Sequence, residues 1–285
     1  MAQQSKAAAA TRQVIKKMGE TLMEIIKEYV ARRKQALKTE IEALTIKPTL
    51  VIVQVGNIEA SNRYVRNKIA DCNEVGIVCN LVHFEDSITE SELLIEIDKL
   101  NTNPSVTGFI VQFPLPKHIS EKKVMEAISP EKDLDGFHPM SKTVPATPLG
   151  VYTYLKDMKF DFVGKNAVVI GRSDIVGRPM AKLLLNESMN VTVLHSKTHA
   201  VDKAFYLENA DLVVVATGHR GTITSDMLLK SSAVVIDVGI NVNEEGKLCG
   251  DCEKNLPVAF QSPVPGGCGL LTRLALLENA LLLLK

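Results

Sequence analysis

The chain has 285 residues, enough for two domains, with an ordinary globular balance of 46% apolar and 23% charged residues. Its 33 basic and 33 acidic residues cancel, so no global charge indicates binding to nucleic acid or to a membrane surface. We find neither a secretory leader nor an apolar stretch of membrane-spanning length. The five scattered cysteines favour reduced thiols and a cytoplasmic location.

The first half of the chain is predicted to alternate strands with helices. Apolar residues at three- and four-residue steps predict one or two helices over residues 6–44, which end before Lys47-Pro48. The alternation follows, with strands expected at 49–55, 79–84 and 108–112 and helices at 61–75, 91–100 and 121–128. This order is typical of a parallel sheet with crossover helices.

A segment rich in proline and glycine, residues 133–148, interrupts this alternation, and its part 144–148 is expected to be extended. We place a domain junction there. A second α/β unit then follows, with a helix expected at 150–158 and strands at 167–170, 191–194, 212–216 and 233–238. A last helix, 271–284, is too short to form a domain and is expected to pack on the first one.

A strand–turn–helix at residues 166–185 is the centre of the second unit. Such a turn aims backbone N–H groups and the positive end of a helix dipole at an anion, usually a pyrophosphate. Gly171 allows a tight turn and Gly177 a close approach of helix to strand, while Ser173 replaces the central glycine of the G-x-G-x-x-G pattern. A plain turn without a nucleotide is the alternative.

The end of the next strand bears on the choice between NADP and NAD. An NAD-binding fold usually has a carboxylate there for the ribose 2′-OH, but this strand ends in His195-Ser196-Lys197-Thr198. A hydroxyl and a cation suit a 2′-phosphate, and Arg172 could reach the same place. The residues therefore favour NADP, with a polar surface loop as the alternative. Thr217, Gly218 and Ile240 follow two further strands on the predicted cofactor side.

The first domain offers a different set of polar side chains. Tyr64 and Lys68 share one helix face and could bracket a substrate, with Lys68 as a base if burial lowers its pKa. Gln112 ends a strand and could orient a substrate or an amine. An exposed helix pair and a loop-capping amide are the respective alternatives. Asp133 and Asp135 lie in a turn, where an aspartate is normally structural.

Together, these residues fall in motifs that occur in a fixed order. The motifs are Ala60-Ser61-x-x-Tyr64-Val65-x-x-Lys68, Ile110-Val111-Gln112-x-Pro114-Leu115-Pro116, Pro130-x-Lys132-Asp133-x-Asp135-Gly136, Gly171-Arg172-Ser173-x-Ile175-Val176-Gly177-x-Pro179, His195-Ser196-Lys197-Thr198 and Pro263-Val264-Pro265-Gly266-Gly267. From about Thr49 to its end the chain closely resembles the bifunctional methylenetetrahydrofolate dehydrogenase/methenyltetrahydrofolate cyclohydrolase family.

The resemblance implies two domains with the active site between them. One is an N-terminal three-layer α/β folate-binding domain, residues 1–148 completed by 270–285, and the other is a Rossmann-type NADP-binding domain with a parallel sheet, residues 149–269. The implied activity is oxidation of 5,10-methylenetetrahydrofolate with NADP, followed by hydrolysis to 10-formyltetrahydrofolate. A monofunctional dehydrogenase and a non-catalytic nucleotide-binding protein are the alternatives. A homodimer through the second domain is expected, and no metal is needed.

The resemblance also implies residue roles. Lys68 is the central catalytic residue, flanked by Tyr64 and tuned by Gln112, and Asp135 anchors the pterin ring. The expected folate contacts are Tyr64, Val65, Lys68, Val111, Gln112, Phe113, Asp135, Pro265, Gly266 and Gly267. The expected NADP contacts are Gly171, Arg172, Ser173, Ser196, Thr217, Gly218, Ile240 and Thr272. Leu270, where proline is usual, and Arg273, where we expect an apolar residue, depart from the family pattern. The C-x-x-C pair Cys249 and Cys252 is interpreted as a chance spacing.

Overall fold

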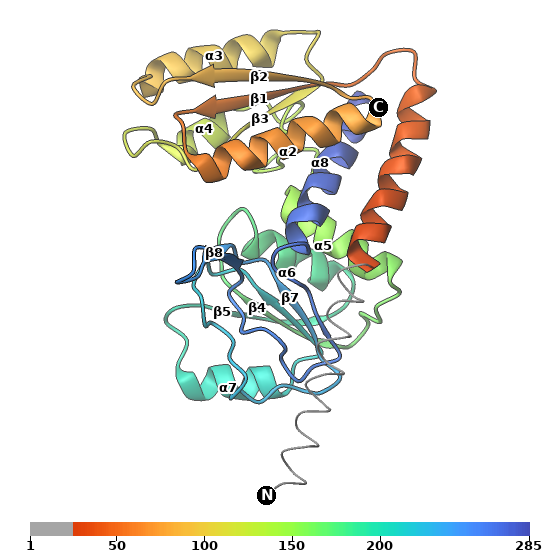
Figure 1. Ribbon diagram of the computed structural model, residues 1–285, viewed down its shortest axis with the longest axis vertical. Coiled ribbons are helices and arrows are strands. Elements are labelled where there is room, and N and C mark those ends of the chain that lie inside the picture. The colour runs from red at the N-terminus through yellow and green to blue at the C-terminus, as the bar shows by residue number, and fades with distance from the viewer. Residues whose placement is uncertain (1–24) are drawn as a thin grey trace, which may run out of the picture. The chain divides into compact units, whose positions relative to one another are not determined.

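The computed structural model describes residues 25–285, which divide into two compact units. We call Ala31–Ala146 with Arg273–Lys285 the first unit. The second unit comprises Thr147–Thr272 together with residues 25–30. Figure 1 shows both units and labels their helices and strands. The part of the predicted N-terminal helices that precedes residue 25 lies outside the described residues, and residues 25–42 are helical.

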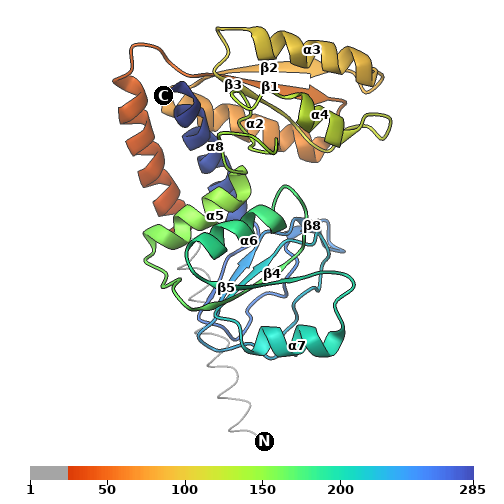
Figure 2. The ribbon, with the colours of Figure 1, turned by 180° about the vertical axis from the view of Figure 1, so that it is seen from behind.

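The first unit is built on a parallel sheet in the order β2-β1-β3. Its strands are β1 (Thr49–Val55), β2 (Val78–Phe84) and β3 (Gly108–Val111), and its helices are α2 (Glu59–Val75), α3 (Glu90–Thr102), α4 (Glu121–Ala127) and most of α8 (Cys268–Leu284). α3 and α2 lie on opposite faces of this sheet (Figures 1 and 2). Because both faces of the central strand are covered, β1 is apolar apart from Thr49 and Gln54.

Ion pairs fasten the helices of the first unit and explain one departure from the family pattern. The guanidinium of Arg273, on α8, lies 2.7 Å from the carboxylate of Asp71, on α2. Lys34, in the helical segment 25–42, lies 2.5 Å from the same carboxylate. Asp71 is buried, and a buried carboxylate is stabilised only when cations and hydrogen bonds surround it. Arg273 is therefore a partner for a buried charge in place of the expected apolar side chain.

The second unit is a Rossmann-type parallel sheet in the order β10-β7-β6-β4-β5. Its strands are β4 (Asn166–Ile170), β5 (Asn190–Leu194), β6 (Leu212–Val215), β7 (Val234–Asp237) and β10 (Phe260–Gln261). The helices α5 (Ala146–Asp157) and α6 (Gly177–Asn186) pack on one face, and α7 (Ala200–Glu208) packs on the other (Figure 2). The predicted α/β class with parallel sheets is thus confirmed.

The segment 144–148, expected to be extended, was predicted wrongly. α5 begins at Ala146, so Thr147 and Pro148 belong to its first turn. Proline is tolerated there because the first N–H groups of a helix have no intrahelical acceptor. The helix α7 and the two-stranded hairpin of β8 (Asn241–Val242) and β9 (Leu248–Cys249) were not predicted. Short elements of this kind lack the periodic length on which sequence prediction depends.

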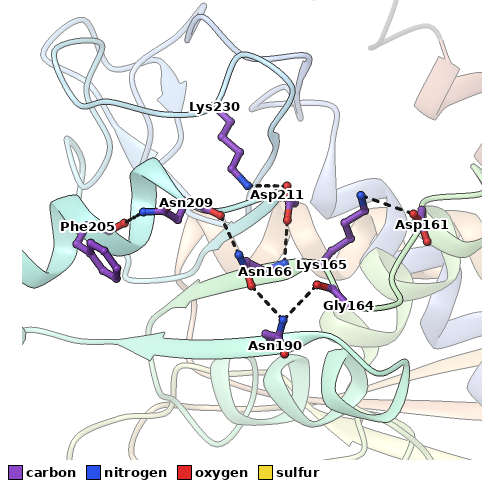
Figure 3. Close-up of polar contacts among 9 residues, drawn as sticks. All are labelled: Asp161, Gly164, Lys165, Asn166, Asn190, Phe205, Asn209, Asp211 and Lys230. Atoms are coloured by element: carbon purple, nitrogen blue, oxygen red, sulfur yellow. Dashed lines mark hydrogen bonds and ion pairs between the residues drawn. The ribbon is translucent and has the colours of Figure 1, made fainter.

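Polar side chains tie together the amino ends of the second unit's strands (Figure 3). The Asn190 side-chain amide donates to the carbonyl of Gly164 and to the side chain of Asn166, both at 3.1 Å. The carboxylate of Asp211 accepts from the backbone N–H of Asn166 at 2.9 Å and from Lys230 at 2.8 Å. These contacts are structural, because ligands of parallel sheets bind at the opposite, carboxyl ends of the strands.

Two general properties follow from the described residues. No helix within residues 25–285 is long and apolar enough to span a bilayer. All five cysteines of the chain lie in this part, and each is a free thiol.

Candidate active site

The nucleotide turn of the second unit has the close contacts that its glycines imply. Gly171 has φ +121°, and a Cβ there would lie 2.2 Å from the carbonyl oxygen of Ala216. A Cβ on Gly177 would lie 2.2 Å from the carbonyl oxygen of Gly171, so the helix start touches the turn. The Ser173 hydroxyl accepts from the N–H of Val176 at 3.2 Å. The residue that replaces the central glycine thus accepts from N–H groups of the turn that leads into α6.

A pocket of about 400 Å³ opens at the carboxyl ends of β4, β5 and β6. Its lining contains five of the predicted cofactor residues, namely Gly171, Arg172, Ser173, Ser196 and Thr217. Lys203, which was not predicted, also lines it. Among the described lining residues there is no aspartate or glutamate. Two cations without an acidic neighbour in the wall make the pocket suited to an anion.

A buried carboxylate that sequence reasoning missed holds the loop that follows β6. Asp251 accepts from the N–H and the hydroxyl of Thr217 at 2.7 and 2.9 Å, and from the N–H of Gly218 at 2.9 Å. Its second oxygen accepts from the Asn241 side chain at 2.8 Å. Asp251 is fully buried and lies inside the C-x-x-C segment. No local pattern marks it, because its partners come from two other parts of the chain.

A second buried carboxylate supports the first. Asp237 accepts from the N–H groups of Gly239 and Asp251 at 3.0 Å and of Cys252 at 2.9 Å. A Cβ on Gly250 would lie 1.9 Å from a carboxylate oxygen of Asp237. Burial raises the pKa of Asp237 despite these donors. The C-x-x-C segment therefore binds the Asp237 carboxylate at the end of β7 through its backbone, and it carries Asp251 to the loop after β6. Gly250 is required because any side chain there would collide with Asp237.

The other predicted residues of the second unit lie outside this pocket. Ile240 is exposed, and the Thr272 hydroxyl bonds the hydroxyl of Thr147 at 3.1 Å and the carbonyl of Cys268 at 2.9 Å. Gly218 is held by Asp251, as described above. Of the predicted folate loop, Pro265, Gly266 and Gly267 also belong to this unit. Their ligand contacts stay predictions.

In the first unit, the structure brings Lys68, Tyr64 and Gln112 together. Lys68 is buried on α2, and its ammonium nitrogen lies 3.1 Å from the Gln112 side-chain oxygen. The same nitrogen lies 5.2 Å from the centre of the Tyr64 ring. Burial lowers the pKa of Lys68, and the charge of Asp135 opposes this shift. The helix spacing that placed Tyr64 and Lys68 on one face thus yields a buried amine with a neutral partner.

Gln112 is fixed in the orientation that this partnership needs. Its backbone N–H donates to the carbonyl of Val53 at 2.8 Å, which extends the pairing of β1 with β3. Its side-chain NH₂ donates to the carbonyl of Phe113 at 2.7 Å. Since the NH₂ group has an acceptor, the amide oxygen is the atom that faces Lys68. Gln112 therefore accepts a hydrogen bond from the amine without adding a charge.

The two turn aspartates have different environments. Asp133 is buried, and its carboxylate accepts from the N–H groups of Gly136 at 2.9 Å and His138 at 2.8 Å. The Asp135 carboxylate makes no hydrogen bond to another described residue, and burial raises its pKa while Lys68 lowers it. Asp133 thus shapes the turn, and the ligand contact expected of Asp135 stays a prediction. Asn279, on α8, fixes this stretch by donating to the carbonyls of Leu134 and Val144, both at 2.9 Å.

The remaining predicted folate contacts are apolar. Val65 and Val111 are buried, and Val111 packs within the core between β3, α3 and α4. Phe113 is half-buried and stacks on Phe137 with ring centres 5.9 Å apart. Among residues 25–285, no group of three His, Cys, Asp or Glu side chains is placed to hold a metal ion.

Comparisons with known proteins match each half of the chain to one domain of a known family. Residues 17–135 match the catalytic domain of the tetrahydrofolate dehydrogenase/cyclohydrolase family, and residues 145–285 match its NAD(P)-binding domain. The chain is similar to the bifunctional protein FolD of Staphylococcus aureus strain Newman, with 46% identity over 275 residues that cover 91% of this chain and 93% of the relative.

Solved structures give the same result. A bifunctional FolD methylenetetrahydrofolate dehydrogenase/cyclohydrolase from Campylobacter jejuni matches with a TM-score of 0.82 and 41% identity, over 93% of this chain and 96% of its own. The Trypanosoma brucei methylenetetrahydrofolate dehydrogenase-cyclohydrolase, solved with NADP cofactor and an inhibitor, matches with a TM-score of 0.81 and 31% identity. The match covers 93% of this chain and 95% of the Trypanosoma chain. The resemblance drawn from the motifs is thereby confirmed, and the chain belongs to the tetrahydrofolate dehydrogenase/cyclohydrolase family.

Proposed function

We propose that this chain oxidises 5,10-methylenetetrahydrofolate with NADP and then hydrolyses the 5,10-methenyl product to 10-formyltetrahydrofolate. The observation that carries the proposal is the buried Lys68 amine, whose pKa is lowered by burial and whose hydrogen-bond partner is the neutral amide of Gln112. A lowered pKa makes the neutral, proton-accepting form of the amine easier to reach, and hydrolysis requires such a proton acceptor whereas hydride transfer does not. We assign folate binding to the first unit and NADP binding to the second.

The second unit fits the dinucleotide. The Gly171 cradle, which a Cβ would fill, and the start of α6 suit the pyrophosphate. Arg172 and Ser196 line the pocket and offer a cation and a hydroxyl to a 2′-phosphate, with no acidic lining residue to repel it. Asp251 holds Thr217 and Gly218 in place. NADP supplies the acceptor for the hydride that leaves the folate methylene carbon.

The first unit then carries out the hydrolysis of the methenyl product. Neutral Lys68 accepts a proton from the water that attacks the methenyl carbon, and it returns that proton to N5 of the folate as the bond from N5 to this carbon breaks. The hydroxyl proton of the adduct passes to solvent, so one proton is released for each cation hydrolysed. Asp135, which has no competing hydrogen bond in the described chain, accepts from the N–H donors of the pterin.

A single mixing experiment separates the alternatives. The pure protein is combined with methylenetetrahydrofolate and NADP, and cofactor reduction is followed together with the absorbance of the methenyl product. A bifunctional enzyme reduces NADP and the methenyl signal rises and then decays faster than it does without enzyme. A monofunctional dehydrogenase leaves the methenyl species to its uncatalysed decay. The absence of any reduction would favour a non-catalytic nucleotide-binding protein. Both Lys68 and Gln112 are present, which favours two activities.

Two further assignments accompany this function. The family resemblance supports a homodimer formed through the second unit, and sedimentation equilibrium would test it. The free state of all five cysteines supports a cytoplasmic location, where thiols stay reduced.

A further inference from the structure

We propose that Lys203 is a specificity-determining residue that contacts the 2′-phosphate of NADP. This inference rests on the proposed function, because it assigns one more residue to the same pocket. Lys203 lies in α7 and lines the pocket with Arg172 and Ser196. It is half-buried, and its ammonium group donates to the carbonyl of Thr222 at 2.6 Å. One of its three N–H bonds is therefore used for anchoring, and two are left for a ligand.

Within residues 25–285, Lys203 forms no ion pair with a carboxylate. Burial lowers the pKa of Lys203, and the opposing influence comes from the thiol of Cys252, not from a carboxylate. Two other lysines of the second unit differ in this respect: Lys230 lies 2.8 Å from Asp211, and Lys165 lies 3.7 Å from Asp161 (Figure 3). Partial burial of an unpaired ammonium is unfavourable, and an anion that enters the pocket removes that cost.

The position of Lys203 indicates which phosphate it meets. The pyrophosphate of a dinucleotide belongs at the turn between β4 and α6, whereas the ribose 2′ group belongs at the end of β5. β5 ends at Leu194, the lining residues Ser196 and Thr198 follow, and Lys203 comes from the helix directly after them. Lys197, the cation that the sequence suggests for this role, is exposed and is not among the lining residues. Of these two lysines, Lys203 is therefore the one placed to meet a phosphate in this pocket.

Binding of nucleotide fragments tests this assignment without catalysis. Adenosine 2′,5′-bisphosphate and adenosine 5′-monophosphate are titrated into the full-length protein by calorimetry, and they differ only in the 2′-phosphate. We expect Lys203→Met to weaken binding of the bisphosphate by roughly 10- to 100-fold, which is the value of a charge-assisted hydrogen bond. Binding of the monophosphate should weaken by less than about 2-fold. Lys203→Arg should keep most of the affinity. Lys197→Met should change the ratio of the two affinities by less than about 3-fold.

Kinetics give a second measurement. In Lys203→Met, the KM for NADP should rise by a similar factor while kcat and the KM for NAD stay within about 2-fold. If Lys203→Met weakened the binding of both nucleotides equally, Lys203 would only support the fold, and the proposal would be overturned. A dominant effect of Lys197→Met, or a wild-type protein without any preference for the bisphosphate, would also overturn it. Failure of the proposed function is seen separately, as a wild-type protein that reduces neither cofactor in the presence of methylenetetrahydrofolate.

Discussion

Replacing Gln112 by glutamate should disable the water step by holding Lys68 protonated. The amide oxygen of Gln112 lies 3.1 Å from the Lys68 nitrogen, so a carboxylate in its place puts two unit charges at that separation. At an effective dielectric constant of about 20, their attraction is about 5 kcal/mol. If desolvation of the new carboxylate cancels about half of this, the remaining 2.7 kcal/mol or so makes the neutral amine about 100-fold rarer.

The assay follows the decay of added methenyltetrahydrofolate as a function of pH. Burial lowers the pKa of Lys68 from the ordinary value of 10.5, and the neutral form is the one that accepts a proton. The wild-type rate should therefore rise as pH increases through the lowered pKa. In Gln112→Glu the rise should move to higher pH, and the rate at neutral pH should fall by about 100-fold. Hydride transfer, measured separately as NADP reduction, should fall much less.

The matched control is Gln112→Met, which removes the hydrogen bond but adds no charge. Its cyclohydrolase rate should fall by about tenfold, the value of one lost hydrogen bond, without movement of the pH profile to higher pH. If the glutamate and methionine variants had the same pH profile, or if the glutamate variant kept the wild-type rate at neutral pH, the role given to a neutral Lys68 would be wrong.

The remaining predictions concern three other positions. Lys68→Met should lower the cyclohydrolase rate by about 100-fold or more while calorimetry shows unchanged NADP binding, and a loss of NADP binding would contradict the assignment of the two units. Ser196→Asp should repel the 2′-phosphate and move the ratio of kcat/KM for NADP and NAD toward NAD by about tenfold or more, and an unchanged ratio would exclude our account of the pocket. Asp251→Ala should lower the free energy of unfolding in urea by roughly 3 kcal/mol or more, because the N–H groups of Thr217 and Gly218 lose the buried carboxylate that accepts from them. The exposed Glu208→Ala should change this free energy by less than about 0.5 kcal/mol, and a similar small effect of Asp251→Ala would refute the anchoring role.

The sequence by itself determined the features that depend on near neighbours along the chain. Apolar runs such as 49–55 predict strands covered on both faces, and the observed β1 matches its expected bounds. Four-residue spacing places Tyr64 and Lys68 on one helix face, and the structure keeps them together. The glycine spacing at Gly171 and Gly177 predicts a tight turn, and both glycines prove necessary there.

Only the tertiary structure decided which of several similar residues carries a role. Asp133 and Asp135 look alike in the sequence, but only Asp133 meets the backbone donors of its own turn. The sequence pointed to Lys197 as the cation beside Ser196, yet Lys203 lines the pocket and Lys197 does not. Asp251 serves strand ends that lie far from it in sequence. The physical reason is common to all three: the desolvation and pairing of a charge depend on groups brought together from distant parts of the chain, and local periodicity contains no information about them.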